Sequence, residues 1–150
     1  MQKLSAIPLV CVLACGGGGG SDRGGQGLAL ARLGLKMDAP AGSTASDGVM
    51  GGVLVEGPGL TVTVDEALAT RPKLAEEAEK EAEMYNPQQA KVERLADGFV
   101  FTFENSGGLG KNYWVQVRRE IGGRSYWCES TTASPEQQAT ATAACLSLKQ

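Results

Sequence analysis

Residues 92–103 read VERLADGFVFTF, the pattern of two short strands joined by a tight turn. Asp97-Gly98 favours a type I′ turn, because both residues tolerate the positive φ angles that this turn needs. After the turn, Phe99, Phe101 and Phe103 occupy alternate positions, so their rings lie on one face of a strand. We therefore expect a hairpin of residues 92–95 and 99–103 whose aromatic face supplies the centre of a core.

Two further strands continue this pattern toward the C-terminus. A loop is expected over residues 104–111, followed by a strand over 113–121, the turn Gly122-Gly123 and a strand over 125–130. Consecutive strands joined by such turns run antiparallel, so the four segments predict an antiparallel meander.

A helix is predicted at the end of the chain. Ser134, Pro135 and Gln137 have the spacing of a helix start with a capping box. One side of this helix is apolar and carries Ala141, Ala144, Cys145 and Leu148. That side is expected to face the strand over 125–130.

Before the hairpin, a helix is expected that Thr70 caps, with Pro72 in its first turn and Asn86-Pro87 at its end. Four residues at helical spacing form its inner face: Leu74, Ala78, Ala82 and Tyr85. Acidic residues occupy its water side: Glu76, Glu77, Glu79 and Glu83. With Glu81 included, this acidic run is interpreted as a solvated helix face rather than as a calcium or catalytic site.

The first part of the domain is expected to hold short strands over 33–39, 53–55 and 60–64, with a loop over 41–48. The fold class is therefore α+β. We predict an antiparallel sheet, built from the four-stranded C-terminal meander and short N-terminal strands, packed with two helices.

The N-terminus has the pattern of a targeting signal. Lys3 precedes an apolar run over 4–14, which has the order of a secretory leader and is too short to span a bilayer. Residues 12–15, Val-Leu-Ala-Cys, resemble the lipobox of bacterial lipoproteins. The resemblance implies cleavage before Cys15 and attachment of lipid to its thiol. Two other interpretations stay open: a plain secretory leader, and an apolar tail in which Cys15 is incidental.

Five glycines follow Cys15, and a glycine run cannot join a core because it loses much backbone entropy and buries no side chain. The expected organisation is a signal peptide over 1–14, a lipidated cysteine and flexible tether over 15–26, and a single α+β domain over 27–150. The expected location is the cell envelope. Gly16 is not the aspartate of an inner-membrane retention signal, which favours the outer membrane, facing the periplasm.

Two cysteines remain in the predicted domain, Cys128 and Cys145. In an oxidising periplasm they can form one disulfide, which would connect the last helix to the sheet. The alternative is a pair of buried thiols.

Charge and composition exclude several functions. A net charge of −3 does not fit a nucleic-acid-binding protein, which would need a basic patch. The chain has no histidine, which removes the commonest general base and metal ligand. The glycines and lysine of residues 107–111 lack the hydroxyl residue and the helix of a phosphate loop. We therefore predict no metal, no cofactor and no enzymatic activity.

The order of predicted elements resembles the PsbP/DcrB-like group of small exported proteins. The resemblance includes Pro40 after an amphipathic strand and the closing residues Leu146-Ser147-Leu148-Lys149. It implies a non-catalytic protein that binds other proteins or acts as an accessory factor.

A binding surface is predicted on the strand over 113–121, where Trp114, Gln116 and Arg118 alternate with more apolar residues. Trp114 is expected to be exposed, or else to be covered by a helix or by the early strands. The predicted function is a membrane-tethered binding or assembly module, whose partner would be an envelope protein or peptidoglycan. The alternative is a small envelope hydrolase that uses carboxylates or a Ser-Lys pair.

Overall fold

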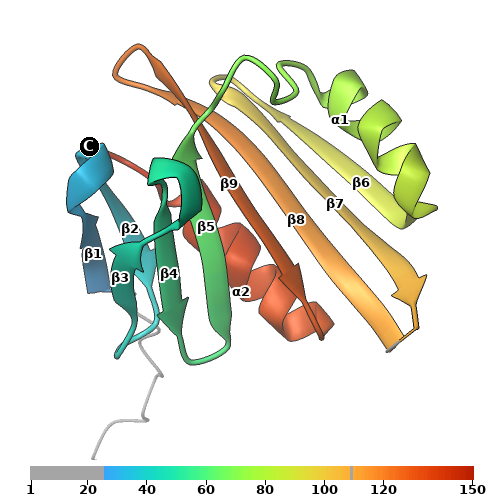
Figure 1. Ribbon diagram of the computed structural model, residues 1–150, viewed down its shortest axis with the longest axis horizontal. Helices are drawn as coiled ribbons and strands as arrows, with labels where there is room; N and C mark the ends of the chain where they lie inside the picture. The colour runs from blue at the N-terminus through green and yellow to red at the C-terminus, as the bar shows by residue number, and fades with distance from the viewer. Residues whose placement is uncertain (1–25, 109) are drawn as a thin grey trace, which may run out of the picture.

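A computed structural model describes residues 26–108 and 110–150 (Figure 1). The larger sheet has seven antiparallel strands in the order β3-β4-β5-β9-β8-β7-β6. Their bounds are β3 Thr44–Asp47, β4 Val53–Gly57, β5 Leu60–Glu66, β6 Gln88–Leu95, β7 Gly98–Gly107, β8 Gly110–Ile121 and β9 Arg124–Thr132. A separate hairpin consists of β1 Gln26–Leu30 and β2 Leu35–Ala39. The helices are α1 Ala75–Ala82 and α2 Pro135–Leu146.

The α+β class and the C-terminal meander are confirmed. Strands β6, β7, β8 and β9 pair consecutively, with Phe101 opposite Gln116 and Val117 opposite Cys128. The loop expected over 104–111 is wrong, because β7 extends to Gly107 and β8 begins at Gly110. Polar pairs across this extension stabilise it, including an ion pair of 2.9 Å between Lys111 and Glu104.

The N-terminal strands differ from the expectation in two places. Strand β1 begins at Gln26, the last residue of the predicted tether, and pairs with β2. The expected strand over 33–39 starts only at Leu35, because the preceding residues form a 3₁₀ turn that ends at Gly34 with φ 66°. Strand β3 lies in the loop expected over 41–48. Its four side chains are all exposed, so no alternating burial marks it in the sequence. The predicted signal peptide lies outside the described residues, as does the tether as far as residue 25.

Helix α1 is shorter than predicted. Thr70 and Pro72 lie before it, and the carboxylate of Glu77 accepts main-chain hydrogen bonds from Lys73 and Leu74 at its start. A 3₁₀ turn, η3 Glu83–Tyr85, continues from its end. Leu74 and Tyr85, expected inside, are exposed, whereas the small side chains of Ala75, Ala78 and Ala82 are buried. Alanine allows the helix to approach the sheet closely.

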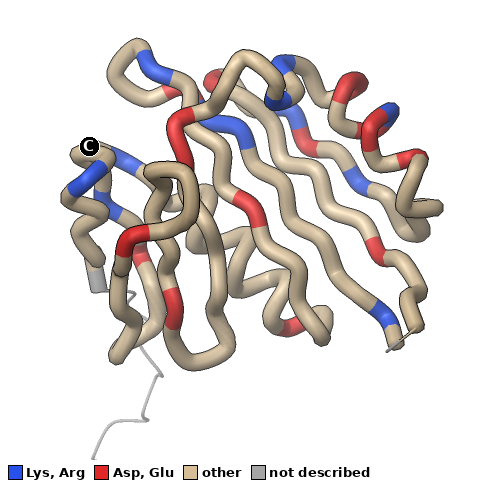
Figure 2. The backbone as a smooth tube through the Cα atoms, viewed as in Figure 1, with Lys and Arg blue, Asp and Glu red and all other residues tan. Residues whose placement is uncertain are grey.

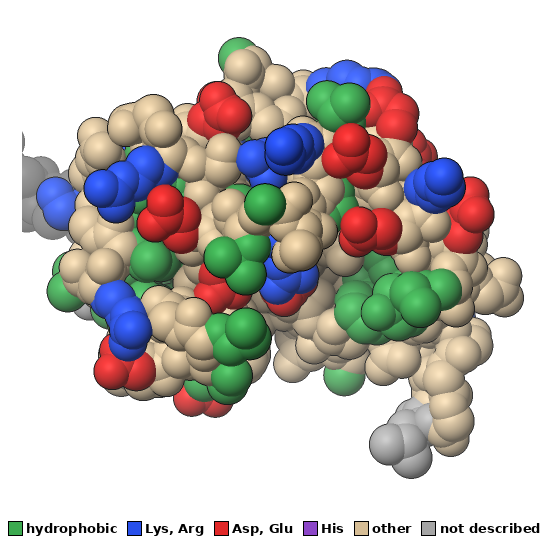
Figure 3. Space-filling view, turned by 45° about the horizontal axis from the view of Figure 1, so that its top comes forward, with side chains coloured by type: hydrophobic (Ala, Val, Ile, Leu, Met, Phe, Trp, Pro, Cys, Tyr) green, Lys and Arg blue, Asp and Glu red, His purple; other side chains and the backbone are tan. Residues whose placement is uncertain are grey.

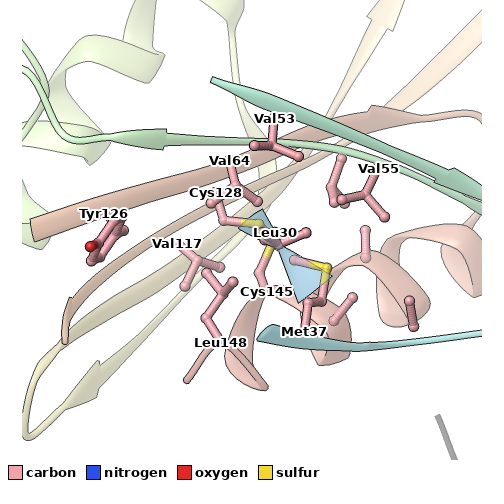
Figure 4. Packing of buried hydrophobic residues seen from close by; sticks show 14 of the residues in the cluster. Leu30, Met37, Val53, Val55, Val64, Val117, Tyr126, Cys128, Cys145 and Leu148 are labelled. Carbon is pink, nitrogen blue, oxygen red and sulfur yellow. A yellow bond between two sulfur atoms is a disulfide. The ribbon is translucent and has the colours of Figure 1, made fainter. Parts of the chain in front are cut away.

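Helix α2 lies on the other face of the sheet from α1 (Figure 1). The Ser134 hydroxyl accepts a hydrogen bond of 3.3 Å from the Gln137 main-chain N–H, as the predicted cap requires. The Cys128–Cys145 disulfide is confirmed, with the two α-carbons 5.7 Å apart. Figure 4 shows the bond between β9 and α2, among Leu30, Met37 and Val64.

The sheet therefore has a core on each face. The disulfide core contains the valines of β4, β5 and β8, together with β1, β2 and α2. The aromatic core lies under α1 and contains Phe99, Phe101, Phe103 and Trp127. The phenylalanines thus share one face as predicted, and they form the smaller of the two cores.

Candidate functional site

A cleft of about 560 Å³ lies beside α1, on the face of the sheet that carries the aromatic core. Its walls come from β5, β9, β8 and the α1–η3 segment. Helix α1 has only eight residues and packs mainly against β7, so it leaves part of β5, β9 and β8 open. The space-filling view shows apolar side chains gathered beside acidic and basic ones around this part of the surface (Figure 3).

One wall of the cleft is aromatic. Trp114 stacks on Phe103 with ring centroids 5.4 Å apart and an interplanar angle of 6°. Tyr85 lies 4.9 Å from Trp114 between ring centroids, and the Trp114 Nε1–H donates a 3.0 Å hydrogen bond to Asn105 Oδ1. Trp114 is consequently fixed in position, while Tyr85 and Met84 at the rim remain 42% and 79% exposed.

Gln116 contributes an unsatisfied polar group to the lining of the cleft. Its Oε1 atom is buried and has no hydrogen-bond partner among the described residues. A buried amide oxygen without a partner costs about 1–3 kcal/mol, so this end of the Gln116 side chain opposes the stability of the fold.

Two opposite charges neutralise each other at the cleft. The Arg71 guanidinium donates two hydrogen bonds to the Glu129 carboxylate, at 2.7 and 3.0 Å, and lies 5.2 Å above the Trp127 ring centroid. The Trp127 Nε1–H donates to the same carboxylate at 2.7 Å. Arg71 belongs to the segment between β5 and α1, so this pair holds that segment across β9.

Asp65 lies next to this pair, opposite Trp127 in the β5–β9 ladder. Burial raises the pKa of the Asp65 carboxyl. The Arg71 guanidinium lowers the same pKa by a smaller amount, and repulsion from Glu129 raises it. The Asp65 carboxylate lies directly against Gly52. A β-carbon added to Gly52 would lie 1.7 Å from Asp65 Oδ1, so a larger residue does not fit there.

The predicted surface residues occupy different environments. Trp114 and Gln116 line the cleft, as expected for one face of β8. Trp114 and its neighbour Tyr113 are both half-buried, so the expectation that Trp114 is the exposed member of the pair is wrong, and Tyr85 after α1 lies against its ring. Arg118 is buried and donates a 3.1 Å hydrogen bond to the Pro72 carbonyl oxygen. Arg118 therefore lies under the segment before α1 and outside the lining of the cleft, which corrects its expected place beside Trp114 and Gln116 on an exposed surface.

Sequence reasoning missed Tyr85, Met84, Arg71 and Glu129. The predicted helix placed Tyr85 inside, and nothing local connects Arg71 with a carboxylate 58 positions later. Acidic residues are numerous along α1, as Figure 2 shows, and one of them, Glu81, lines the cleft.

The side chains of Ser130 and Glu129 on β9 both form hydrogen bonds within the fold. Ser130 donates its hydroxyl to the Thr61 carbonyl oxygen at 2.5 Å, and Glu129 is held by Arg71 and Trp127. Within residues 26–108 and 110–150, no group of three or more Cys, Asp or Glu side chains is placed to hold a metal ion. No helix in the described part of the chain has the length and apolar character needed to cross a membrane.

The described part of the chain is thus an α+β domain with a mixed aromatic and polar cleft on one face of an antiparallel sheet. No protein-family model matches the sequence, and comparison with curated proteins finds no match. The resemblance to the PsbP/DcrB-like group stays a prediction.

Proposed function

We propose that this protein is a non-catalytic binding module of the bacterial cell envelope, tethered to the outer membrane by lipid on Cys15, which binds an envelope protein through the cleft. The observation that carries the binding role is the lining itself. A fixed Trp114 and the exposed Tyr85 and Met84 offer apolar contact, and Gln116 adds an amide side chain to the same lining.

The state of the polar groups supports binding over hydrolysis. A nucleophile needs a free hydroxyl beside a base, and a carboxylate pair needs two titratable groups in one pocket. Glu129 is instead held by Arg71 and Trp127, Ser130 lies opposite Val115 on the α2 face of the sheet, and Glu81 lies at the exposed end of α1. An acidic α1 also makes a negatively charged partner less favourable (Figure 2).

The membrane tether is supported by residues 12–20 alone, where the lipobox-like Val-Leu-Ala-Cys precedes five glycines. A flexible glycine-rich segment would let the domain turn its cleft toward partners in the periplasm. Two or three acyl chains would make the attachment effectively permanent.

The proposal is tested by replacing Met84 with a photocrosslinking amino acid in the full chain, in living cells. Met84 is 79% exposed at the cleft rim, so the change leaves the core intact. We expect a specific crosslinked partner, identified by mass spectrometry, and a loss of that band when Gln116→Ala and Tyr85→Ala are combined with it. Met50 is the matched control, because it is a methionine, 90% exposed, and outside the cleft lining. The same chain should incorporate labelled fatty acid, and Cys15→Ser should abolish this labelling while Cys11→Ser should not.

Equal crosslinking from Met84 and Met50 would contradict the cleft as the binding site. If the residue at position 84 crosslinks to peptidoglycan and not to a polypeptide, the proposed envelope-protein partner is wrong and the cleft binds peptidoglycan. Continued labelling of the Cys15→Ser chain would refute the anchor.

A further inference from the structure

The outer edge of β6 carries opposite charges on alternate residues. In the described sheet, β6 is the last strand, and no strand pairs with its outer side. Lys91 lies opposite Thr102 and Glu93 lies opposite Val100 on β7, so both charged residues share the face that carries α2. Both are exposed, and neither forms an ion pair in the described part of the chain.

We propose that β6 pairs antiparallel with β6 of a second copy of this chain, with Val92 opposite Val92 of that copy. In this register Lys91 lies opposite Glu93 of the second copy, and Glu93 lies opposite its Lys91. Opposite charges across a strand pair are favourable, and a two-fold axis produces the pair twice. Sliding the strands by two residues in either direction places Lys91 against Lys91 or Glu93 against Glu93, which is unfavourable.

This charge pattern differs from the usual protection of an edge strand. Edges are commonly protected by charged side chains that repel any approaching strand. An alternating Lys91 and Glu93 repels in the shifted registers and attracts in the symmetric one. The opposite edge, β3, lacks this pattern, since its one charged residue, Asp47, is bridged by Arg32 at 3.4 Å.

A second observation lies beside this edge. A groove of about 720 Å³ runs between β6–β7 and α2, and its lining includes Val100, Thr102, Ala143 and Leu146. The two-fold axis of an antiparallel strand pair is perpendicular to the sheet, so both α2 helices stay on the same face. The two grooves then adjoin across the interface and add apolar surface next to the charged pairs. The cleft beside α1 lies on the other face, and the inference is independent of the proposed function.

The test uses full-length chains with two different affinity tags, expressed together. Wild-type copies should copurify. Lys91→Glu alone and Glu93→Lys alone should each reduce copurification at least about tenfold, because both cross-strand pairs become repulsive. Coexpression of the tagged Lys91→Glu chain with the tagged Glu93→Lys chain should restore it, since the mixed pair again joins opposite charges. The double variant Lys91→Glu/Glu93→Lys should also pair with itself.

A disulfide crosslink between the two β6 strands tests the proposed register. Val92→Cys should form a dimer that reductant dissolves, because opposite residues in an antiparallel pair have α-carbons about 4.5–5.5 Å apart. Lys36→Cys, on β2, is the exposed control and should give little dimer. Monomeric wild-type protein, single variants that copurify as well as wild type, or absence of restoration in the mixed pair would each overturn the proposal. The charge changes lie on an exposed edge, so an unchanged melting temperature separates lost pairing from unfolding.

Discussion

The half-buried Asp65 carboxylate lowers the stability of the fold when it is ionised. Its carboxyl is half-buried between β4 and β9, close to the Arg71–Glu129 pair, and burial raises its pKa. A raised pKa means that the folded chain holds this proton more tightly than the unfolded chain. The contribution of Asp65 to the free energy of unfolding is therefore greatest below the pKa that this carboxyl has in the unfolded chain. It declines as the pH rises through the pKa of the folded chain.

Asp65→Asn should remove this decline. The free energy of unfolding of wild type minus that of the variant should fall as pH increases from about 4, the usual aspartate pKa, and then become constant. Urea denaturation at a series of pH values measures the difference. Glu66→Gln, an exposed neighbour, removes the same charge and is the control. A wild-type advantage that grows with pH would contradict the assignment.

Arg71, in contrast to Asp65, stabilises this region. It connects three groups, since it is paired with Glu129, stacked over Trp127 and followed by buried Pro72, whose carbonyl oxygen accepts from Arg118. A lysine could supply the charge but could not form the two parallel hydrogen bonds. The segment before α1 is thus held on the sheet by side chains, which explains how so short a helix keeps a defined place.

At the scale of elements, the hairpin between β6 and β7 depends on one glycine. Gly98 has φ 155°, and a β-carbon there would lie 1.9 Å from the main-chain oxygen of Arg118 on β8. The neighbouring strand cannot retreat, because it is paired on both sides.

Gly98→Ala should therefore lower the free energy of unfolding by about 2–3 kcal/mol, since the clash is with main chain and cannot be relieved by a rotamer change. Gly59→Ala is the matched control. Gly59 also has a positive φ, 67°, but nothing lies within 4 Å of its β-carbon position, so the cost should be about 1 kcal/mol. Denaturant unfolding of both variants measures the difference. Equal losses at the two positions would show that the close approach to β8 has no effect.

For the whole molecule, the disulfide connects the last helix to the middle of the sheet. Cys128 and Cys145 are both fully buried, and the bond closes a segment with a sequence separation of 17. Helix α2 contacts β8, β9, β5 and β2, so it joins the C-terminal meander to the N-terminal strands.

Loss of this bond should lower the free energy of unfolding by about 3 kcal/mol on the chain-entropy model, which corresponds to a melting temperature about 10 °C lower. Protein refolded with reductant should melt at the lower temperature. The variant Cys128→Ala/Cys145→Ala should also melt lower and should be insensitive to reductant. An unchanged melting temperature after full reduction would be inconsistent with a stabilising bridge.

Local patterns were sufficient to predict the antiparallel meander, the Ser134 cap and the Cys128–Cys145 pair. Alternation of side chains and turn residues act over a few positions, and two cysteines allow one pairing. The strand β3 and the true start of α1 were not predictable, because exposed β3 has no burial pattern and α1 buries alanines while Leu74 lies outside. The cleft is a property of the tertiary structure. It exists because α1 covers only part of one sheet face, and because Arg71 meets Glu129 across 58 positions of sequence, an encounter that depends on strand order and on no local pattern.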